Sequence, residues 1–420
     1  MQRWLKFAGY LPATGWQPII YTPSNPSVLS IDSSLLEEVP PGIEVLRRPI
    51  TEISGLAQKL TGGRGGNGGG TGIDGGKKSL LGKIALFLRG NLFIPDPRVA
   101  WVAPSVRFLK EWLRSHPVDV IVTTGPPQSM HLIGLRLHRE TGIPWVADFR
   151  DPWTEMFWFK HLRLTAPARK KHFRLEKEVL DGASAIVSVS PHVARSFARK
   201  TVTPVHLVTN GYEEADYAEE VPADGFFNIV HTGMFARGGN PVALWKALKE
   251  LCDEDAVFAG ALRLRFSGKT DAEVLTAVRD AGLGDKVLDG GYLPHKEAVR
   301  EQKLASVLLL PLRREPESAD ILPGKLFEYL AARRPVLGVD CQGSAMGEIL
   351  EETSSGKVFV WEDADGMKEY VRGLWQRFSA GEDLRTAGGI EKYSRRATAA
   401  QMAGVLDSVI SGSQGPSDKY

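Results

Sequence analysis

The 420-residue chain lacks several features that mark specialised classes of protein. It has only two cysteines, Cys252 and Cys341, which belong to no C-x-x-C or Cys/His cluster. This pattern disfavours a disulfide framework and a structural zinc site, and it favours a reducing compartment. The 52 basic and 50 acidic residues leave a net charge of +2, whereas a nucleic-acid-binding domain carries a strong basic excess. No apolar run approaches the roughly 18 residues that cross a bilayer.

Glycine is the one residue in clear excess, and the excess is local. Ten of the 44 glycines lie between Gly62 and Gly76. Such a segment cannot bury apolar surface, so residues 62–78 are predicted to form a flexible insertion. Its basic edge and the following sequence LLGKIALFLRG make Lys77–Arg89 a candidate contact with a membrane surface. The alternative is a mobile loop beside an ordinary core helix.

Elsewhere, strand-like and helix-like patterns alternate along the chain. Strands are expected at 18–21, 43–46, 119–123, 145–148, 185–188, 205–208, 227–231, 262–266, near 287, 307–311, 336–339 and 357–360. Strands that alternate with helices of ten or more residues indicate βαβ units on parallel sheets. The pattern predicts an α/β protein with two Rossmann-like doubly wound domains. We assign residues 1–211 to the first domain, 212–226 to a linker, 227–395 to the second domain and 396–420 to a terminal helix and polar tail.

The most informative stretch is SADILPGKLFEYLAARRPVLG, at 318–338. Pro323 and Gly324 are predicted to open a helix, whose free N–H groups form an anion site. Lys325 adds a positive charge there, and Glu328 follows three residues later on nearly the same helix face. A phosphate at the helix start would leave Glu328 in reach of sugar hydroxyls. The alternative is an ordinary capped helix with a surface Lys–Glu pair.

Charged and polar residues also follow two strands of the first domain. ADFRDPW places Asp148, Arg150 and Asp151 at a strand's carboxyl end, where ligands of parallel sheets bind. An arginine is a poor general base, so Arg150 is better suited to bind an acceptor or a phosphate. In TTGPPQS, the next helix start and Ser129 could line the same cleft. A structural salt bridge is the alternative for the charged group.

Several other motifs fail on spacing. FSGKTD contains GKT after a strand, but the glycine that a phosphate-binding P-loop requires is replaced by Arg263. No G-x-G-x-x-G follows a strand, which disfavours a dinucleotide-dependent dehydrogenase. Two D-x-D sequences, Asp253–Asp255 and Asp363–Asp365, are better explained as solvated acidic faces. We therefore expect no metal site.

At this point the residues resemble a known family. PGKLFEYLAARRPVLG is similar to the donor-binding motif of the retaining family-4 (group 1) glycosyltransferases with the GT-B fold. The sequences DVIVTTGPPQSMHLIG, GIPWVADFRDPW, VTNGY and HTGMF occur in the family's order, and RWLKFAGYLPATGWQP resembles its first helix and second strand. The resemblance implies two Rossmann-like domains that face a cleft, with the donor nucleotide bound by the second domain.

The resemblance also implies roles for residues of the second domain. Lys325 would contact the nucleotide diphosphate and Glu328 the ribose. Glu328 corresponds to the second acid of the family's Glu-x7-Glu signature, and the first acid falls on Asp320, a shorter side chain. The family carries basic residues after the HTGMF strand to neutralise the pyrophosphate. That role falls on Arg237, beyond the strand end at Gly233, although the lysine that usually follows is absent.

In the first domain, Arg150 and Asp151 stand where related enzymes often have a His–Asp pair, and they are the candidate catalytic residues together with Asp320. Asp148 and Ser129 are expected on the acceptor side of the cleft. The implied function is transfer of a sugar from a nucleotide-sugar donor to a glycan or lipid-linked acceptor, with retention and without a cofactor or obligatory metal. The expected role is in cell-surface polysaccharide or lipopolysaccharide biosynthesis, and the expected location is cytoplasmic, peripheral on the inner membrane face.

One departure keeps alternatives open. The family normally begins with a strand and a glycine-rich turn, whereas this chain starts inside the first helix at Met1. One alternative is therefore a truncated, non-catalytic relative that binds a nucleotide or a partner. Another is a sugar-nucleotide epimerase on the same fold, which would need acid–base carboxylates and histidines that the sequence does not identify.

Overall fold

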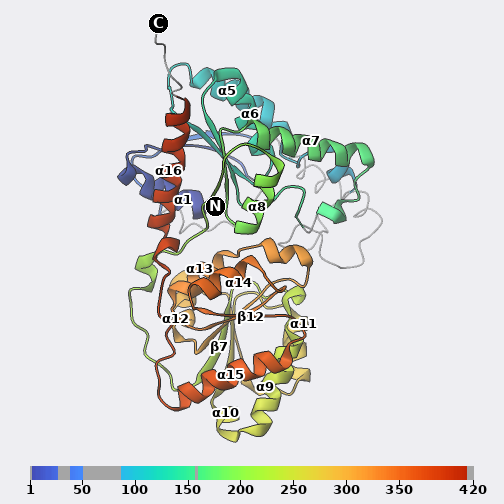
Figure 1. The fold of residues 1–420 in the computed structure, drawn as a ribbon, viewed down its shortest axis with the longest axis vertical. Coiled ribbons are helices and arrows are strands. Elements are labelled where there is room, and N and C mark those ends of the chain that lie inside the picture. The colour runs from blue at the N-terminus through green and yellow to red at the C-terminus, as the bar shows by residue number, and fades with distance from the viewer. Residues whose placement is uncertain (1, 27–37, 51–86, 157–158, 414–420) are drawn as a thin grey trace. The chain divides into compact units, whose positions relative to one another are not determined.

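The computed structural model describes residues 2–26, 38–50, 87–156 and 159–413 (Figure 1). The chain divides into two compact units. Unit 1 comprises Met1–Thr209 and Ala399–Tyr420, and unit 2 comprises Asn210–Thr398. The glycine-rich insertion and most of Lys77–Arg89 lie outside the described residues. Each unit is described below by itself.

Unit 1 contains two groups of parallel strands. Four strands pair in the order β3-β4-β5-β6, and β1 and β2 form a separate parallel pair. The strands are β1 (Ile19–Pro23), β2 (Glu44–Arg48), β3 (Ile121–Gly125), β4 (Trp145–Phe149), β5 (Ala185–Ser188) and β6 (Val205–Leu207). Every residue of β4 and β5 is buried, as expected of parallel strands that are covered on both faces.

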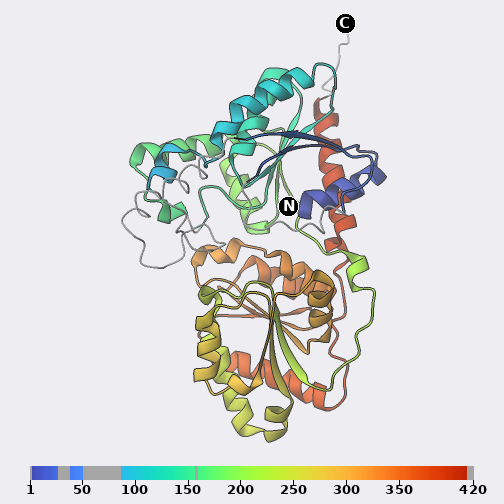
Figure 2. The same ribbon diagram turned by 180° about the vertical axis from the view of Figure 1, so that it is seen from behind.

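Helices cover both faces of the four-stranded sheet. One face packs against α5 (Val102–Trp112), α6 (Ser129–Thr141), α7 (Ala166–Gly182) and α8 (Pro191–Lys200). The other face packs against α1 (Gln2–Tyr10) and α16 (Arg395–Ser413), which come from opposite ends of the chain. Figure 2 shows α1 in blue beside α16 in red. The C-terminal helix thus begins in unit 2 and completes the core of unit 1.

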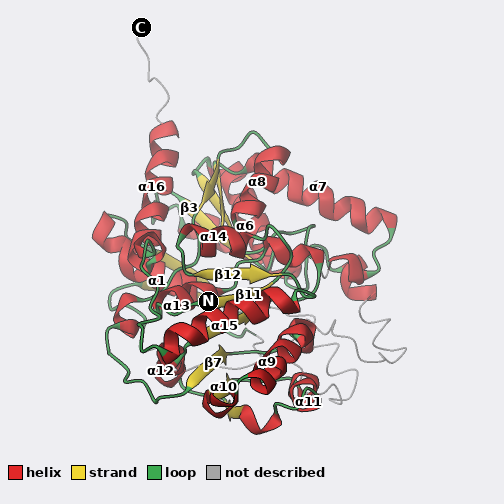
Figure 3. Ribbon diagram, turned by 60° about the horizontal axis from the view of Figure 1, so that its bottom comes forward, coloured by secondary structure: helices red, strands yellow, loops and turns green. Residues whose placement is uncertain are grey.

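Unit 2 has one parallel sheet with the strand order β12-β11-β10-β7-β8-β9. Figure 3 labels β7, β11 and β12 of this sheet. The strands are β7 (Phe227–Thr232), β8 (Leu262–Ser267), β9 (Val287–Gly291), β10 (Val307–Pro311), β11 (Val336–Val339) and β12 (Gly356–Phe359). The chain moves outward from β7 through β8 to β9, and then returns to β10 on the other side of β7. This reversal creates a topological switch point between β7 and β10, where doubly wound sheets bind ligands.

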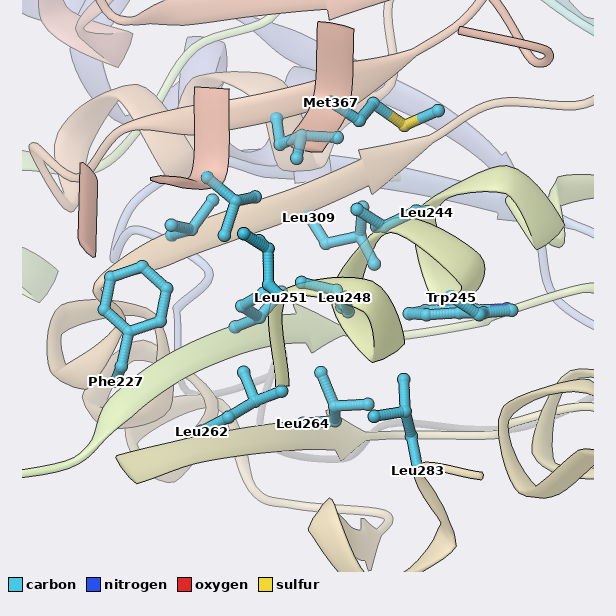
Figure 4. Packing of buried hydrophobic residues seen from close by; sticks show 14 of the residues in the cluster. Phe227, Leu244, Trp245, Leu248, Leu251, Leu262, Leu264, Leu283, Leu309 and Met367 are labelled. Carbon is cyan, nitrogen blue, oxygen red and sulfur yellow. The ribbon is translucent and has the colours of Figure 1, made fainter. Parts of the chain in front are cut away.

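Two apolar layers flank the sheet of unit 2. One joins it to α9 (Val242–Glu254), α10 (Ala256–Ala261), α11 (Ala272–Asp280) and α15 (Ala364–Ser379). Figure 4 shows part of this layer, where Trp245 and Leu248 of α9 pack near Leu264 of β8. The other layer contains α13 (Gly324–Ala331) and α14 (Ala345–Glu352). Helix α12 (His295–Leu304) follows β9.

The architecture confirms the predicted fold class, because both units are α/β with parallel sheets covered by helices. Among the helices of the described residues, none is long and apolar enough to cross a membrane.

Candidate functional site

The predicted donor residues gather at the carboxyl edge of the unit 2 sheet. Strand β7 ends at Thr232 and is followed by the exposed Gly233. Helix α13 begins at Gly324, and its side chains reach the end of β7. This edge contains the switch point of the sheet, so the topology and the sequence motif indicate the same place.

Glycines allow the backbones at this edge to approach one another closely. Gly233 and Gly268 have φ angles of +89° and +123°, which L-residues with side chains rarely adopt. The Gly233 N–H donates to the carbonyl of Ser267 at 2.6 Å. A Cβ atom on Gly268 would lie 2.2 Å from the carbonyl oxygen of Gly233. The first residue after β7 and the first after β8 therefore must be glycine, and backbone is exposed at the site.

The start of α13 offers unshielded N–H groups. Pro323 is its N-cap residue and makes no side-chain capping bond. Gly324 is exposed, and a Cβ atom there would meet nothing within 4 Å. The first N–H groups of a helix lack partners within the helix and carry partial positive charge. This end of α13 is suited to bind an anionic group.

Lys325 is held above the end of β7. Its Nζ lies 3.3 Å from Nε2 of His231 and 3.4 Å from the carbonyl oxygen of Met234. Burial lowers the pKa of Lys325 to about 8, against the opposing effect of the Glu328 charge. The half-buried ammonium has few protein partners, so a bound anion would stabilise its charged form.

His231 supports Lys325 as a neutral acceptor. Burial, followed by the nearby Lys325 charge, lowers its pKa to about 3. Its Nδ1 lies 2.9 Å from the carbonyl oxygen of Leu309. A carbonyl oxygen only accepts, so Nδ1 carries the proton and Nε2 presents a lone pair to the lysine. The HTGMF motif by itself did not indicate this role for its histidine.

Glu328 lies one turn beyond Lys325 and is half-buried. Its Oε2 accepts a hydrogen bond of 3.1 Å from Nε2 of Gln302, on α12. Gln302 is 1% exposed and also bonds to Tyr217 and Thr232. Neither Gln302 nor Tyr217 was identified from the sequence, because they lie far from the α13 motif along the chain.

Arg237 and Asp320 belong to two short 3-10 helices. Arg237 opens a short 3-10 helix, and its Nη1 donates to Oε1 of the exposed Glu273 at 3.1 Å. A phosphate would have to replace this solvent-screened partner. Asp320 ends the 3-10 helix at Pro316–Asp320 and is half-buried. Burial raises the pKa of the Asp340 carboxyl, and the charge of Asp320 adds to this effect.

In unit 1, Asp148 belongs to a closed polar cluster. It is fully buried and accepts hydrogen bonds from Arg3, Trp4 and Thr124. Burial alone would raise its pKa, but Arg3 and these hydrogen bonds hold the pKa below its usual value. Both carboxylate oxygens are used, so Asp148 attaches α1 to the end of β4 and does not present a free carboxylate to an acceptor.

Ser129 also has internal partners. It is 1% exposed, and its N–H and Oγ donate to the two carboxylate oxygens of Asp96 at 2.7 and 2.9 Å. The carboxylate of Asp96 thus caps the start of α6. Ser129 is the first residue of α6, and its hydroxyl is committed to this cap.

Arg150 and Asp151 are half-buried where β4 ends. The Arg150 N–H donates to the Gly125 carbonyl at 2.9 Å, and its Nη2 donates to that of Pro126. Burial raises the pKa of Asp151, and the Arg150 charge partly offsets this. The structure therefore places Arg150 beside the loop that follows β3, and Asp151 comes next in the chain.

Two buried side chains beside this loop were not identified from the sequence. Gln128 is 3% exposed and His131 is fully buried. Within the described part of the chain, both amide atoms of Gln128, Nε2 of His131 and Nε of Arg150 have no hydrogen-bond partner. Unpaired buried polar atoms are costly. The ends of β3 and β4 therefore retain unused capacity for hydrogen bonding to a polar group.

Across residues 2–26, 38–50, 87–156 and 159–413, no group of three or more His, Cys, Asp or Glu side chains could hold a metal ion. The first D-x-D sequence ends α9 and caps α10 through Asp255, and the second caps α15 through Asp363. Both therefore have local structural roles.

Comparison with known families matches both halves of the chain. Residues 85–212 match the model described as a glycosyl transferase 4-like domain, and residues 226–377 match that of the glycosyl transferases group 1. Both matches are to glycosyltransferase domains, so the two α/β units are those of an enzyme that transfers sugars. The chain belongs to the group 1 glycosyltransferases of the GT-B type.

Solved structures support the same fold. Sucrose-phosphate synthase from Thermosynechococcus elongatus aligns with a TM-score of 0.60 and 16% identity, over 97% of this chain and 92% of that one. The lipopolysaccharide outer core galactosyltransferase WaaB gives 0.58 and 12%, over 97% and 94%. WaaG, a glycosyltransferase involved in lipopolysaccharide biosynthesis, gives 0.50 and 12%, over 98% and 94%. None of the curated protein sequences compared with the chain matches it.

Proposed function

We propose that this glycosyltransferase uses a nucleotide-sugar donor, bound at the start of α13, and transfers the sugar with retention to a glycan or lipid-linked acceptor. The observation that carries the donor site is the combination of an exposed helix start with Lys325 and Glu328 one turn apart. A cation and free N–H groups suit a diphosphate, and a carboxylate one turn away suits the hydroxyls of a ribose.

The chemistry follows from the charge that develops on the leaving group. As the sugar–phosphate bond breaks, negative charge accumulates on the nucleoside diphosphate. Lys325 and the N–H groups at Gly324 are oriented before the reaction, so they stabilise this charge without further reorganisation. Arg237 would contribute after exchanging Glu273 for a phosphate. No metal is required for this proposed role.

For the acceptor we propose the polar group at the ends of β3 and β4. Arg150 contributes a positive charge, and Gln128 and His131 contribute unused hydrogen-bonding atoms. These groups suit a hydroxyl or phosphate of the acceptor. Asp151, whose pKa is raised by burial, is the nearby carboxyl group that could exchange a proton with it.

A surface glycan is the proposed product, because the similar structures include a lipopolysaccharide outer core galactosyltransferase, WaaB, and a glycosyltransferase involved in lipopolysaccharide biosynthesis, WaaG. A lipid-linked acceptor would place the enzyme at the cytoplasmic face of a membrane. Residues 87–89, the described part of Lys77–Arg89, belong to a helix at 87–92. On this helix Phe87, Leu88 and Leu92 are 42%, 42% and 64% exposed. These apolar side chains support a membrane contact there.

Calorimetric titration with uridine and guanosine diphosphates tests the donor site. We expect at least one of them to bind the wild type and to bind Glu328→Ala about tenfold more weakly, which corresponds to roughly 1.4 kcal/mol. Glu351→Ala, which removes an exposed carboxylate from α14, is the matched control. Equal affinity of all three proteins would contradict the ribose role of Glu328.

Product analysis tests the reaction. Incubation with the preferred nucleotide sugar should release nucleoside diphosphate, and nuclear magnetic resonance should show the donor's anomeric configuration in the product. Epimerised nucleotide sugar without transfer would instead support the epimerase alternative.

A further inference from the structure

Gln302 lies at the centre of a buried hydrogen-bond network that reaches the donor site. Its Nε2 donates to Oε2 of Glu328 and to Oγ1 of Thr232, each at 3.1 Å. Its Oε1 accepts a hydrogen bond of 2.6 Å from the hydroxyl of Tyr217. The network therefore connects α12 with α13, with the end of β7 and with the short 3-10 helix η4 (Glu214–Tyr217).

The partners of Gln302 determine which way its amide points. A carboxylate oxygen only accepts hydrogen bonds, so the amide nitrogen must face Glu328. Burial, followed by the Glu328 charge, raises the pKa of Tyr217 well above its usual value. The Tyr217 hydroxyl thus stays protonated and donates to Oε1. Reversing the amide would bring its oxygen against the carboxylate.

The η4 segment that carries Tyr217 is bonded to residues of α12. Nζ of Lys303 donates to the carbonyl oxygen of Tyr217 at 2.8 Å and also to that of Glu219. Beside it, Nε2 of His295 lies 2.8 Å from Oδ2 of Asp216. Contacts before and after Tyr217 along the chain therefore attach this segment to α12. The segment follows soon after Thr209, where the first stretch of unit 1 ends.

We propose that Gln302 is a positioning residue for Glu328, and that Tyr217 sets the orientation in which Gln302 does so. Gln302 holds Oε2 of Glu328, whereas Oε1 of Glu328 has no hydrogen bond to any described residue. Fixing a flexible glutamate before binding reduces the conformational entropy lost when the ligand arrives. The recognition of ribose by Glu328 thus depends on residues that do not touch the nucleotide. This inference rests on the proposed donor site.

The test uses variants that alter the network and leave Glu328 unchanged. Tyr217→Phe removes one oxygen atom, and Gln302→Leu removes the bridging amide. Tyr370→Phe is the matched control, because this tyrosine is in the same unit and, among the described residues, its hydroxyl donates to the Val336 carbonyl alone, at 3.3 Å. Titration calorimetry measures the affinity for the preferred nucleoside diphosphate and for its 2′-deoxy and 3′-deoxy analogues.

We expect the wild type and Tyr370→Phe to prefer the ribonucleotide over at least one deoxy analogue by about tenfold. Tyr217→Phe and Gln302→Leu should reduce this preference at least threefold, while their affinity for that deoxy analogue stays within twofold of the wild type. An unchanged preference in Tyr217→Phe, or an equal loss of affinity for all three nucleotides, would overturn the proposal. Tyr217→Phe keeps the test available if Gln302→Leu does not fold.

A Glu328→Ala background separates positioning from a direct effect. If Tyr217 and Gln302 act through Glu328, then adding either substitution to Glu328→Ala should leave nucleotide affinity unchanged. A further loss would overturn the inference. If Glu328→Ala alone keeps the wild-type preference for ribose, the proposed function fails at its donor site. If Glu328→Ala abolishes the preference for ribose while Tyr217→Phe and Gln302→Leu keep it, only the positioning role of Gln302 and Tyr217 fails.

Discussion

At the scale of single residues, burial sets the charge that Lys325 can offer a ligand. The motif predicts that Lys325 lies beside a helix start. The lowered pKa of Lys325, about 8, follows from its burial between the end of β7 and the start of α13. Similarly, His231 becomes a neutral acceptor only because it is enclosed. Neither property can be obtained from residue spacing, because both depend on the removal of water by segments distant in the sequence.

The pKa of Lys325 predicts how nucleotide binding depends on pH. The ammonium is charged below about pH 8 and loses its proton above it, so affinity for a nucleoside diphosphate should fall as the pH rises from 7 to 9. The loss should approach tenfold per pH unit above the pKa. The last ionisation of the diphosphate has a pKa of about 6, below this window. Titrations of Lys325→Arg, which stays charged, should show little change over the same range. An identical pH profile for both proteins would contradict this role.

The buried pair of Arg3 and Asp148 predicts a large stability effect. Arg3→Met would leave the Asp148 carboxylate buried without its cation, which typically costs about 3–5 kcal/mol of unfolding free energy. Urea denaturation should detect this loss. Arg114→Met, which breaks an exposed pair with Glu111, should change stability by no more than about 0.5 kcal/mol.

The same pair has a defined pH dependence. The folded pKa of Asp148 lies below its usual value, so its contribution to stability is present above the unfolded pKa of about 3.9 and is lost as the pH falls through the folded value. The difference in stability between wild type and Arg3→Met should therefore shrink below about pH 4. A difference that is constant with pH would show that the ion pair is not its source.

At the scale of elements, tight turns after β7 and β8 shape the donor site. Gly268→Ala should lower the unfolding free energy by more than about 1 kcal/mol, because its φ is +123° and its new Cβ would clash with Gly233. Thermal unfolding and nucleotide titration should both detect the change, since Lys325 packs against Gly233.

The control for this prediction lies on an open helix surface. Gly260 of α10 is exposed, and a Cβ atom there would meet nothing within 4 Å. Gly260→Ala should be neutral or should stabilise the protein by roughly 0.5–1 kcal/mol. Equal destabilisation by both substitutions would refute the role assigned to the β8 turn.

Elements were also the level at which the sequence was most informative. The alternation of apolar segments predicts the order of strands and helices in both units, and PGKLFE predicts the start of α13 at Gly324. The partners of individual polar residues were less predictable. Asp148 was expected on an open cleft, yet Arg3 encloses it, because α1 packs against a strand more than 140 residues later.

At the scale of the whole molecule, the last helix belongs structurally to the first unit. The apolar face of α16 includes Met402 and Leu406, which pack with Phe7 and Val187 in unit 1. Met402→Ala should cost about 2–5 kcal/mol in unit 1. Hydrogen–deuterium exchange should therefore accelerate in β4 and β5 and remain unchanged in β10 and β11.

A matched substitution in the other core should give the opposite pattern. Met367 of α15 is fully buried in unit 2. Met367→Ala should accelerate exchange in the unit 2 strands and spare β4 and β5. Equal acceleration in both units by either variant would contradict this division of the core.

The sequence by itself determined the two parallel α/β units and the residues of the α13 motif. Apolar periodicity, helix-start chemistry and glycine turns are local properties, so they can be read along the chain. Only the tertiary structure decided that α16 completes unit 1, that Arg3 encloses Asp148, and that Tyr217 and Gln302 hold Glu328. These outcomes depend on contacts between distant segments, and on burial, because a buried polar side chain is stable only when it is hydrogen-bonded.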